Sequence, residues 1–121
     1  HPWWWHGHWQ EPDGRYITDP WLDDFQKIPQ SIHDEFAAAV RQHGKVVEIN
    51  LYAMLLNAHY PETFKYQYLD YIAGLKARGV ALSIGSDCHN ANYNIAFDKA
   101  ARLLDSVGIT DADLWVLPPR H

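Results

Sequence analysis

The stretch that decides the fold spans residues 80–89 and reads VALSIGSDCH. An apolar run bounded by Gly79 and Gly85 is typical of a strand that is covered on both faces of an α/β sheet. Two residues of metal-binding type, Asp87 and His89, follow it at once. In such sheets the chemistry gathers at the carboxyl ends of the strands. The stretch therefore predicts a buried strand that leads directly into a candidate site.

The spacing of Asp87 and His89 predicts where their side chains point. In an extended backbone side chains alternate, so these two share one side and Cys88 points to the other. A carboxylate oxygen and an imidazole nitrogen on one side suit a single divalent ion, and we expect Cys88 not to be a ligand. In a second interpretation Asp87 caps the following turn and His89 is an ordinary surface histidine. Spacing alone leaves both interpretations open.

A second strand is predicted over residues 45–51, where apolar residues frame one acid, Glu48. A carboxylate in an apolar strand is costly unless it is paired or bound to metal. Glu48 and Asn50 are two positions apart and are expected to face the same side, near the site. An ion pair between Glu48 and a lysine or arginine is the alternative.

The first amphipathic segment predicts a helix from an N-cap at Ser31 to Gly44. Its apolar residues recur at a spacing of four, at Ile32, Phe36 and Val40. His33 and His43 lie near the two ends of this helix, where we expect solvated or capping roles.

Two more helices are predicted over residues 61–79 and 97–108, and a short last strand over 114–117. One amphipathic helix separates the strands at 45–51 and 80–85. A strand, a crossover helix and a parallel strand is the usual arrangement of such a sequence. We therefore expect these two strands to be parallel neighbours or next neighbours.

Residues 1–30 hold five of the six tryptophans and show no sustained period, which predicts an irregular, Trp-rich loop. We expect the Trp cluster to pack over the domain as core or lid, and a ligand-binding wall is the alternative. His6 and His8 are candidate neighbours of a metal site, although hydrogen-bonded structural roles are the simpler interpretation. Arg15 is a candidate phosphate-binding residue, with a surface salt bridge as the alternative.

The composition indicates one globular domain. The chain has 121 residues, of which 47% are apolar and 21% are charged, which suits a soluble domain with its own core. A formal charge of −5 without a basic stripe argues against nucleic acid as the main partner and suits a protein that collects cations. A single cysteine excludes an internal disulfide, so a cytoplasmic location is expected. No apolar run approaches the ~20 residues needed to span a bilayer, so no membrane partner is expected.

Residues 84–89, IGSDCH, resemble the closing G-S-D-x-H motif of the PHP (polymerase and histidinol phosphatase) family. The His-Pro pair at the start of the chain is similar to the family's earlier His-Pro motif, and residues 46–50, VVEIN, are similar to the acidic strand between them. The resemblance covers roughly residues 1–107. It implies an α/β fold, namely the C-terminal part of a distorted (β/α)7-type barrel with mainly parallel strands. Residues 1–121 would then be a single domain and the C-terminal segment of a longer PHP domain.

The resemblance also implies roles for individual residues. His1, Asp87 and His89 would be metal ligands, with Asp87 and His89 catalytic, while Glu48 and Asn50 would support the ligands or face the substrate. The family holds up to three divalent ions, and histidine with carboxylate ligands suits Zn, Mn or Fe.

The implied function is metal-dependent hydrolysis of phosphate esters, with metal-bound hydroxide as the nucleophile. The substrate would be a small-molecule or nucleotide phosphate ester. The upstream part of the same PHP domain would complete the site, so this segment alone is expected to be inactive. Two alternatives stay open: an amidohydrolase-like metal hydrolase, and a non-catalytic fragment that binds metal or a partner.

Overall fold

The structure is a computed structural model that describes residues 12–13, 22–89, 91 and 95–120. Its elements alternate helices with two strands, so the described part is a mixed α/β fold. In chain order they are η1 (Phe25–Lys27), α1 (Gln30–Gln42), β1 (Val46–Asn50), the π-helical turn η2 (Leu51–Leu55), α2 (Glu62–Ala77), β2 (Ala81–Gly85), α3 (Phe97–Asp105) and η3 (Asp111–Asp113). No helix in these ranges is long and apolar enough to cross a membrane.

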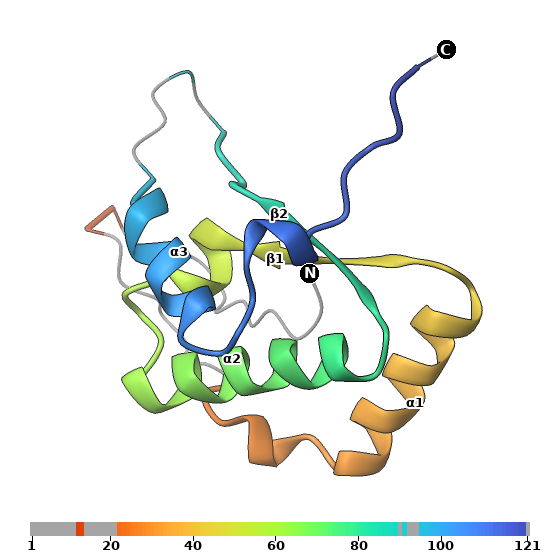
Figure 1. The fold of residues 1–121 in the computed structure, drawn as a ribbon. Helices are drawn as coiled ribbons and strands as arrows, with labels where there is room; N and C mark the ends of the chain where they lie inside the picture. The colour runs from red at the N-terminus through yellow and green to blue at the C-terminus, as the bar shows by residue number, and fades with distance from the viewer. Residues whose placement is uncertain (1–11, 14–21, 90, 92–94, 121) are drawn as a thin grey trace.

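The two strands form a parallel sheet whose register runs from Val46 opposite Ala81 to Asn50 opposite Gly85. This confirms the predicted parallel pairing. The crossover is α2, which lies along one side of the sheet (Figure 1). The turn after α2 uses Gly79 at a φ of 79°, a left-handed conformation that glycine adopts without steric cost.

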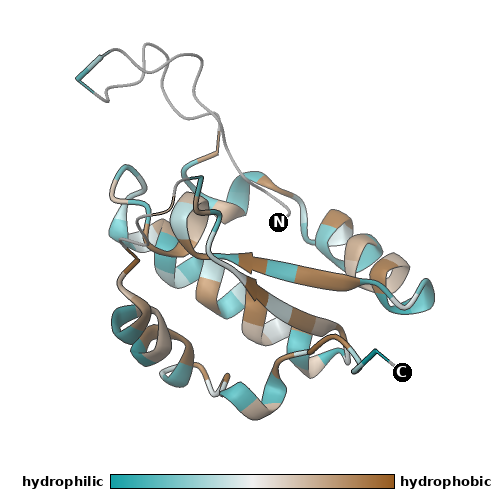
Figure 2. Ribbon diagram, turned by 90° about the horizontal axis from the view of Figure 1, so that it is seen from above, coloured by the Kyte–Doolittle hydropathy of each residue, from teal (hydrophilic) through white to brown (hydrophobic). Residues whose placement is uncertain are grey.

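The hydrophobic core lies between the sheet and α2. Figure 2 shows apolar colouring along both strands, interrupted at polar positions. The buried sheet residues include Val47, Ile49 and Leu82. The predicted apolar stripe of α2 is also buried, at Phe64, Tyr68, Ile72 and Leu75. Burial of each large apolar side chain contributes roughly 1.5–3 kcal/mol, so this layer is what fixes the position of the strand ends.

The start and the buried face of α1 differ from the prediction. Pro29 precedes the first helical residue, and no side chain caps the helix, so the predicted N-cap at Ser31 is wrong. The buried residues of α1 are His33 and Ala37, whereas Ile32 is 41% exposed. The solvated or capping role expected for His33 is therefore also wrong. The helix is turned by about one position because partners outside it decide which face is buried.

The outer part of the sheet is less covered than predicted. In β2 only Leu82 is buried, and Ala81 and Ile84 are exposed, so the expectation of a strand covered on both faces is wrong. Leu114 makes an isolated parallel bridge to Leu82, and the Trp115 N–H donates to the Leu82 carbonyl at 2.7 Å. The strand predicted over 114–117 is thus reduced to a single bridge.

Candidate functional site

The carboxyl ends of β1 and β2 lie side by side, because the strands are parallel and Asn50 is paired with Gly85. The chain leaves β2 through Ser86 into the loop that carries Asp87 and His89. The loop with the predicted metal ligands therefore begins next to the end of the strand that carries Glu48. This is the edge at which parallel α/β sheets place their functional groups.

Asn50 organises the end of β1. It is fully buried, and its Nδ2 donates to Glu48 Oε1 at 3.2 Å. Its Oδ1 accepts from the Ala53 main-chain N–H at 2.7 Å, which caps the π-helical turn η2. The contact between Asn50 and Glu48 agrees with the prediction that they face the same side. Because both ends of the Asn50 amide are engaged, the Glu48 carboxylate is held at the strand end.

The Glu48 carboxylate reaches across to the neighbouring strand and lies against Gly85. A β-carbon added at Gly85 would stand 2.4 Å from Glu48 Oε2 and 2.5 Å from Glu48 Cδ. Any side chain at this position would therefore force the carboxylate to move. A glycine in a strand often marks such a close approach, which is the sequence signal for this contact.

Tyr68 of α2 lies beneath this strand end. Burial raises the pKa of Tyr68, and the charge of Glu48 raises it further. The side chain is 1% exposed, and its hydroxyl has no hydrogen-bond partner in the described part of the chain. Sequence reasoning placed Tyr68 on the packing stripe, and nothing in its spacing indicated a hydroxyl next to the site.

Asp87 and His89 are in direct contact. His89 Nε2 lies 3.1 Å from Asp87 Oδ1, and the His89 side chain is 83% exposed while that of Asp87 is 30% exposed. The backbone between them is not extended, because Asp87 has a φ of 55°. The predicted alternation of side chains through this loop is therefore wrong. Aspartate is one of the few residues that adopt the left-handed region readily, through hydrogen bonds of its short side chain.

The Asp87 and His89 pair has a geometry that fits two ligands of one metal ion. Two ligand atoms 3.1 Å apart, each about 2.1 Å from a shared ion, subtend about 95° at that ion. This angle lies between those of octahedral and tetrahedral coordination. Within the described residues no group of three or more His, Cys, Asp or Glu side chains is arranged to hold a metal. The assignment of Asp87 and His89 as metal ligands therefore stays a prediction, and the contact that the structure shows is a hydrogen bond or ion pair between their side chains.

The other predicted site residues have different outcomes. His1, His6, His8 and Arg15 lie outside the described residues, so their placement stays a prediction. Cys88 is half-buried, and its main-chain N–H donates to Ser86 Oγ at 3.3 Å.

The chain was compared with protein-family models, with curated proteins and with solved structures, and none of the three comparisons gives a match.

Proposed function

We propose that this chain belongs to a metal-dependent phosphoesterase of the PHP type and supplies two of its metal ligands, Asp87 and His89. The observation that carries the proposal is the 3.1 Å contact between a carboxylate and an imidazole in the G-S-D-x-H loop that follows β2. In this proposal β1 and β2 are neighbouring strands of a distorted (β/α)7-type barrel. His1 is a third ligand.

The residues at the strand ends have separate tasks in this mechanism. Asp87 offers a carboxylate oxygen and His89 a neutral imidazole nitrogen, a donor set that suits Zn, Mn or Fe. A divalent ion bound there would supply Lewis acidity for the activation of water and the neutralisation of phosphoryl charge. Glu48, fixed by Asn50, places a second negative charge at the same edge of the sheet, where it orients ligands or substrate. The substrate is a small-molecule or nucleotide phosphate ester.

The left-handed backbone at Asp87 decides which residue can replace it in a test variant. Asparagine tolerates the same conformation, so Asp87→Asn removes the charge while keeping the loop. His89 is exposed, so His89→Ala leaves the core unchanged. Matched controls are His43→Ala at the end of α1 and Asp105→Asn at the end of α3, since both residues are exposed and far along the chain from the loop.

The experiment measures hydrolysis of p-nitrophenyl phosphate and of a nucleotide p-nitrophenyl ester by the full-length protein loaded with Mn²⁺ or Zn²⁺. Each site variant should lose about 100-fold or more of the rate, and each control should keep it. Full activity in both site variants would reject the mechanism. Hydrolysis of amides or lactones in place of phosphate esters would favour the amidohydrolase-like alternative, and bound metal without turnover would favour the binding fragment.

A further inference from the structure

A groove lies away from the strand ends, between η1, the start of α1 and one side of α2. It encloses about 560 Å³, within the range of small-molecule sites. None of its lining residues belongs to β1, β2 or the loop that carries Asp87 and His89. The side of α2 that faces it carries Tyr71 and Gly74, and Arg78, the C-cap of α2, follows four positions later on the same side.

One wall of the groove is aromatic. The Phe25 and Tyr71 ring centroids are 5.3 Å apart, those of His33 and Tyr71 are 4.9 Å apart, and Phe25 and His33 are stacked at 5.9 Å. Burial lowers the pKa of His33, so this imidazole is neutral at physiological pH. Phe25 and His33 are only 7% and 6% exposed, so the half-buried Tyr71 is the ring of this wall with most surface open to a ligand. An aromatic ring is a preferred partner of another planar ring.

Gly74 leaves the groove open at its middle. It lies inside α2, where glycine is less favourable than alanine by roughly 0.5–1 kcal/mol. A β-carbon built at Gly74 meets no atom within 4 Å, so no packing contact in the described residues requires glycine there. The space above Gly74 is available to a ligand.

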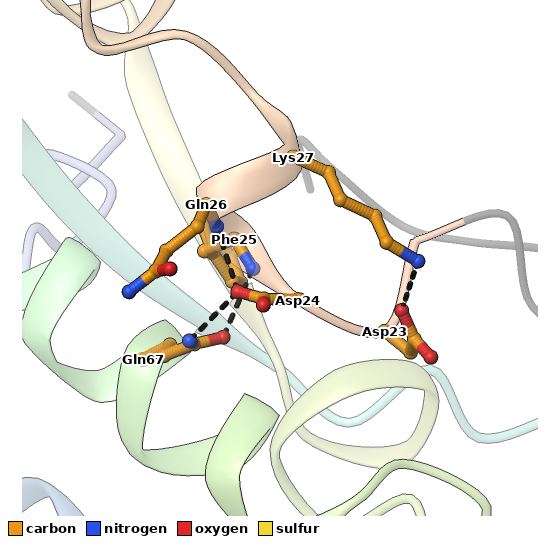
Figure 3. Close-up of polar contacts among 6 residues, drawn as sticks. All are labelled: Asp23, Asp24, Phe25, Gln26, Lys27 and Gln67. Carbon is orange, nitrogen blue, oxygen red and sulfur yellow. Dashed lines mark hydrogen bonds and ion pairs between the residues drawn. The ribbon is translucent and has the colours of Figure 1, made fainter.

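Hydrogen bonds hold η1, which carries Phe25, against α2, as Figure 3 shows. Gln67 of α2 accepts from the Phe25 main-chain N–H at 2.9 Å and donates to Asp24 Oδ1 at 2.9 Å. Asp24 also accepts from the Gln26 main-chain N–H at 2.8 Å, which fixes the first turn of η1. The aromatic wall is thus preorganised, which lowers the entropy cost of binding.

A cationic group stands at one end of the groove. Arg78 Nη2 lies 2.7 Å from Asp34 Oδ1, and the Arg78 side chain is 43% exposed. Such exposed ion pairs contribute little to stability, and a guanidinium has further N–H donors with the geometry to bind a carboxylate. Asp70 also lines the groove, about 12 Å from Arg78 along the axis of α2, given eight residues at 1.5 Å each. An anionic group on a ligand would therefore lie at the Arg78 end.

We propose that this groove binds a small planar aromatic carboxylate. The ring lies against Tyr71 in the space above Gly74, and the carboxylate pairs with the Arg78 guanidinium. The proposal does not depend on the phosphoesterase function, because the groove and the strand-end site share no residue.

The test is a calorimetric or NMR titration of the full-length protein with 2-naphthoate, with 2-naphthol as the uncharged probe. Saturable binding of 2-naphthoate is expected, tighter than that of 2-naphthol by about tenfold. Arg78→Gln should remove this difference and leave 2-naphthol binding unchanged. Gly74→Leu should weaken both probes by about tenfold or more because the side chain fills the groove.

The urea midpoint and far-UV circular dichroism spectrum of Gly74→Leu are measured beside its binding, and a native spectrum separates blocked binding from a misfolded helix. Absence of saturable 2-naphthoate binding at about 5 mM would overturn the proposal. Binding that is unchanged in both Gly74→Leu and Arg78→Gln would place the ligand elsewhere and would also overturn it.

Discussion

Replacement of Gly85 by alanine tests the packing that holds Glu48 at the strand end. The new β-carbon would stand 2.4 Å from Glu48 Oε2, so the carboxylate has to move and its hydrogen bond with Asn50 is lost. A hydrogen bond to a charged group contributes about 1.5–3 kcal/mol. Alanine also recovers roughly 0.5–1 kcal/mol that glycine costs within a strand. The net effect expected for Gly85→Ala is a loss of about 1–2 kcal/mol in the free energy of unfolding.

The assay is urea unfolding followed by far-UV circular dichroism, run as a double-mutant cycle with Glu48→Ala. Without the Glu48 carboxylate the alanine meets no obstacle, so Gly85→Ala should become neutral or stabilising by about 0.5 kcal/mol. Gly74→Ala in α2 is the control, and it should stabilise both backgrounds equally because no atom lies within 4 Å of its β-carbon. An equal loss from Gly85→Ala with and without Glu48 would refute the contact between them.

Three further substitutions test the buried polar groups. The pKa of His33 in the folded state lies below its usual value, because burial disfavours the charged imidazole. The fold is therefore more stable above about pH 6.5, where His33 is neutral in both states, and it loses stability as the pH falls. The urea midpoint should drop between about pH 7.5 and 5.5, and it should drop less steeply in His33→Leu. A slope unchanged in His33→Leu would contradict this. Tyr68→Phe removes a buried hydroxyl without a hydrogen-bond partner in the described residues and should raise the free energy of unfolding by about 1 kcal/mol, whereas a loss of stability would argue against it. Asn50→Ala removes the acceptor of the Ala53 N–H and the donor to Glu48. The free energy of unfolding, measured by denaturant titration, should fall by about 2–3 kcal/mol. A change near zero would show that these bonds do not hold the strand end.

The elements that sequence predicted well are those set by local pattern. The two strands and the helix between them follow from apolar runs, glycine boundaries and a four-residue stripe, and the crossover rule then predicts parallel pairing. Glu48 and Asn50 share a side because alternation within a strand is local as well.

The features that sequence missed depend on contacts between distant segments. The rings of Phe25 and Tyr71, which lie on other elements, contact His33 and shift the buried face of α1. Of the predicted stripe, Phe36 and Val40 pack partly buried against the core and only Ile32 is exposed. The prediction of an extended backbone at Asp87 was wrong for a different reason. Whether an aspartate takes the left-handed or the extended region is decided by its surroundings, and both are open to it.

Asp87 and His89 are proposed to be metal ligands, and the amount of bound metal tests this role most directly. Metal per chain can be determined by X-ray fluorescence or mass spectrometry on the full-length protein after loading with Mn²⁺ or Zn²⁺ and desalting. The wild-type protein and a control variant that carries both His43→Ala and Asp105→Asn should retain the same amount of metal. A variant that carries both Asp87→Asn and His89→Ala should retain less metal, because two adjacent donors have been removed. Equal metal content in all three proteins would contradict the account.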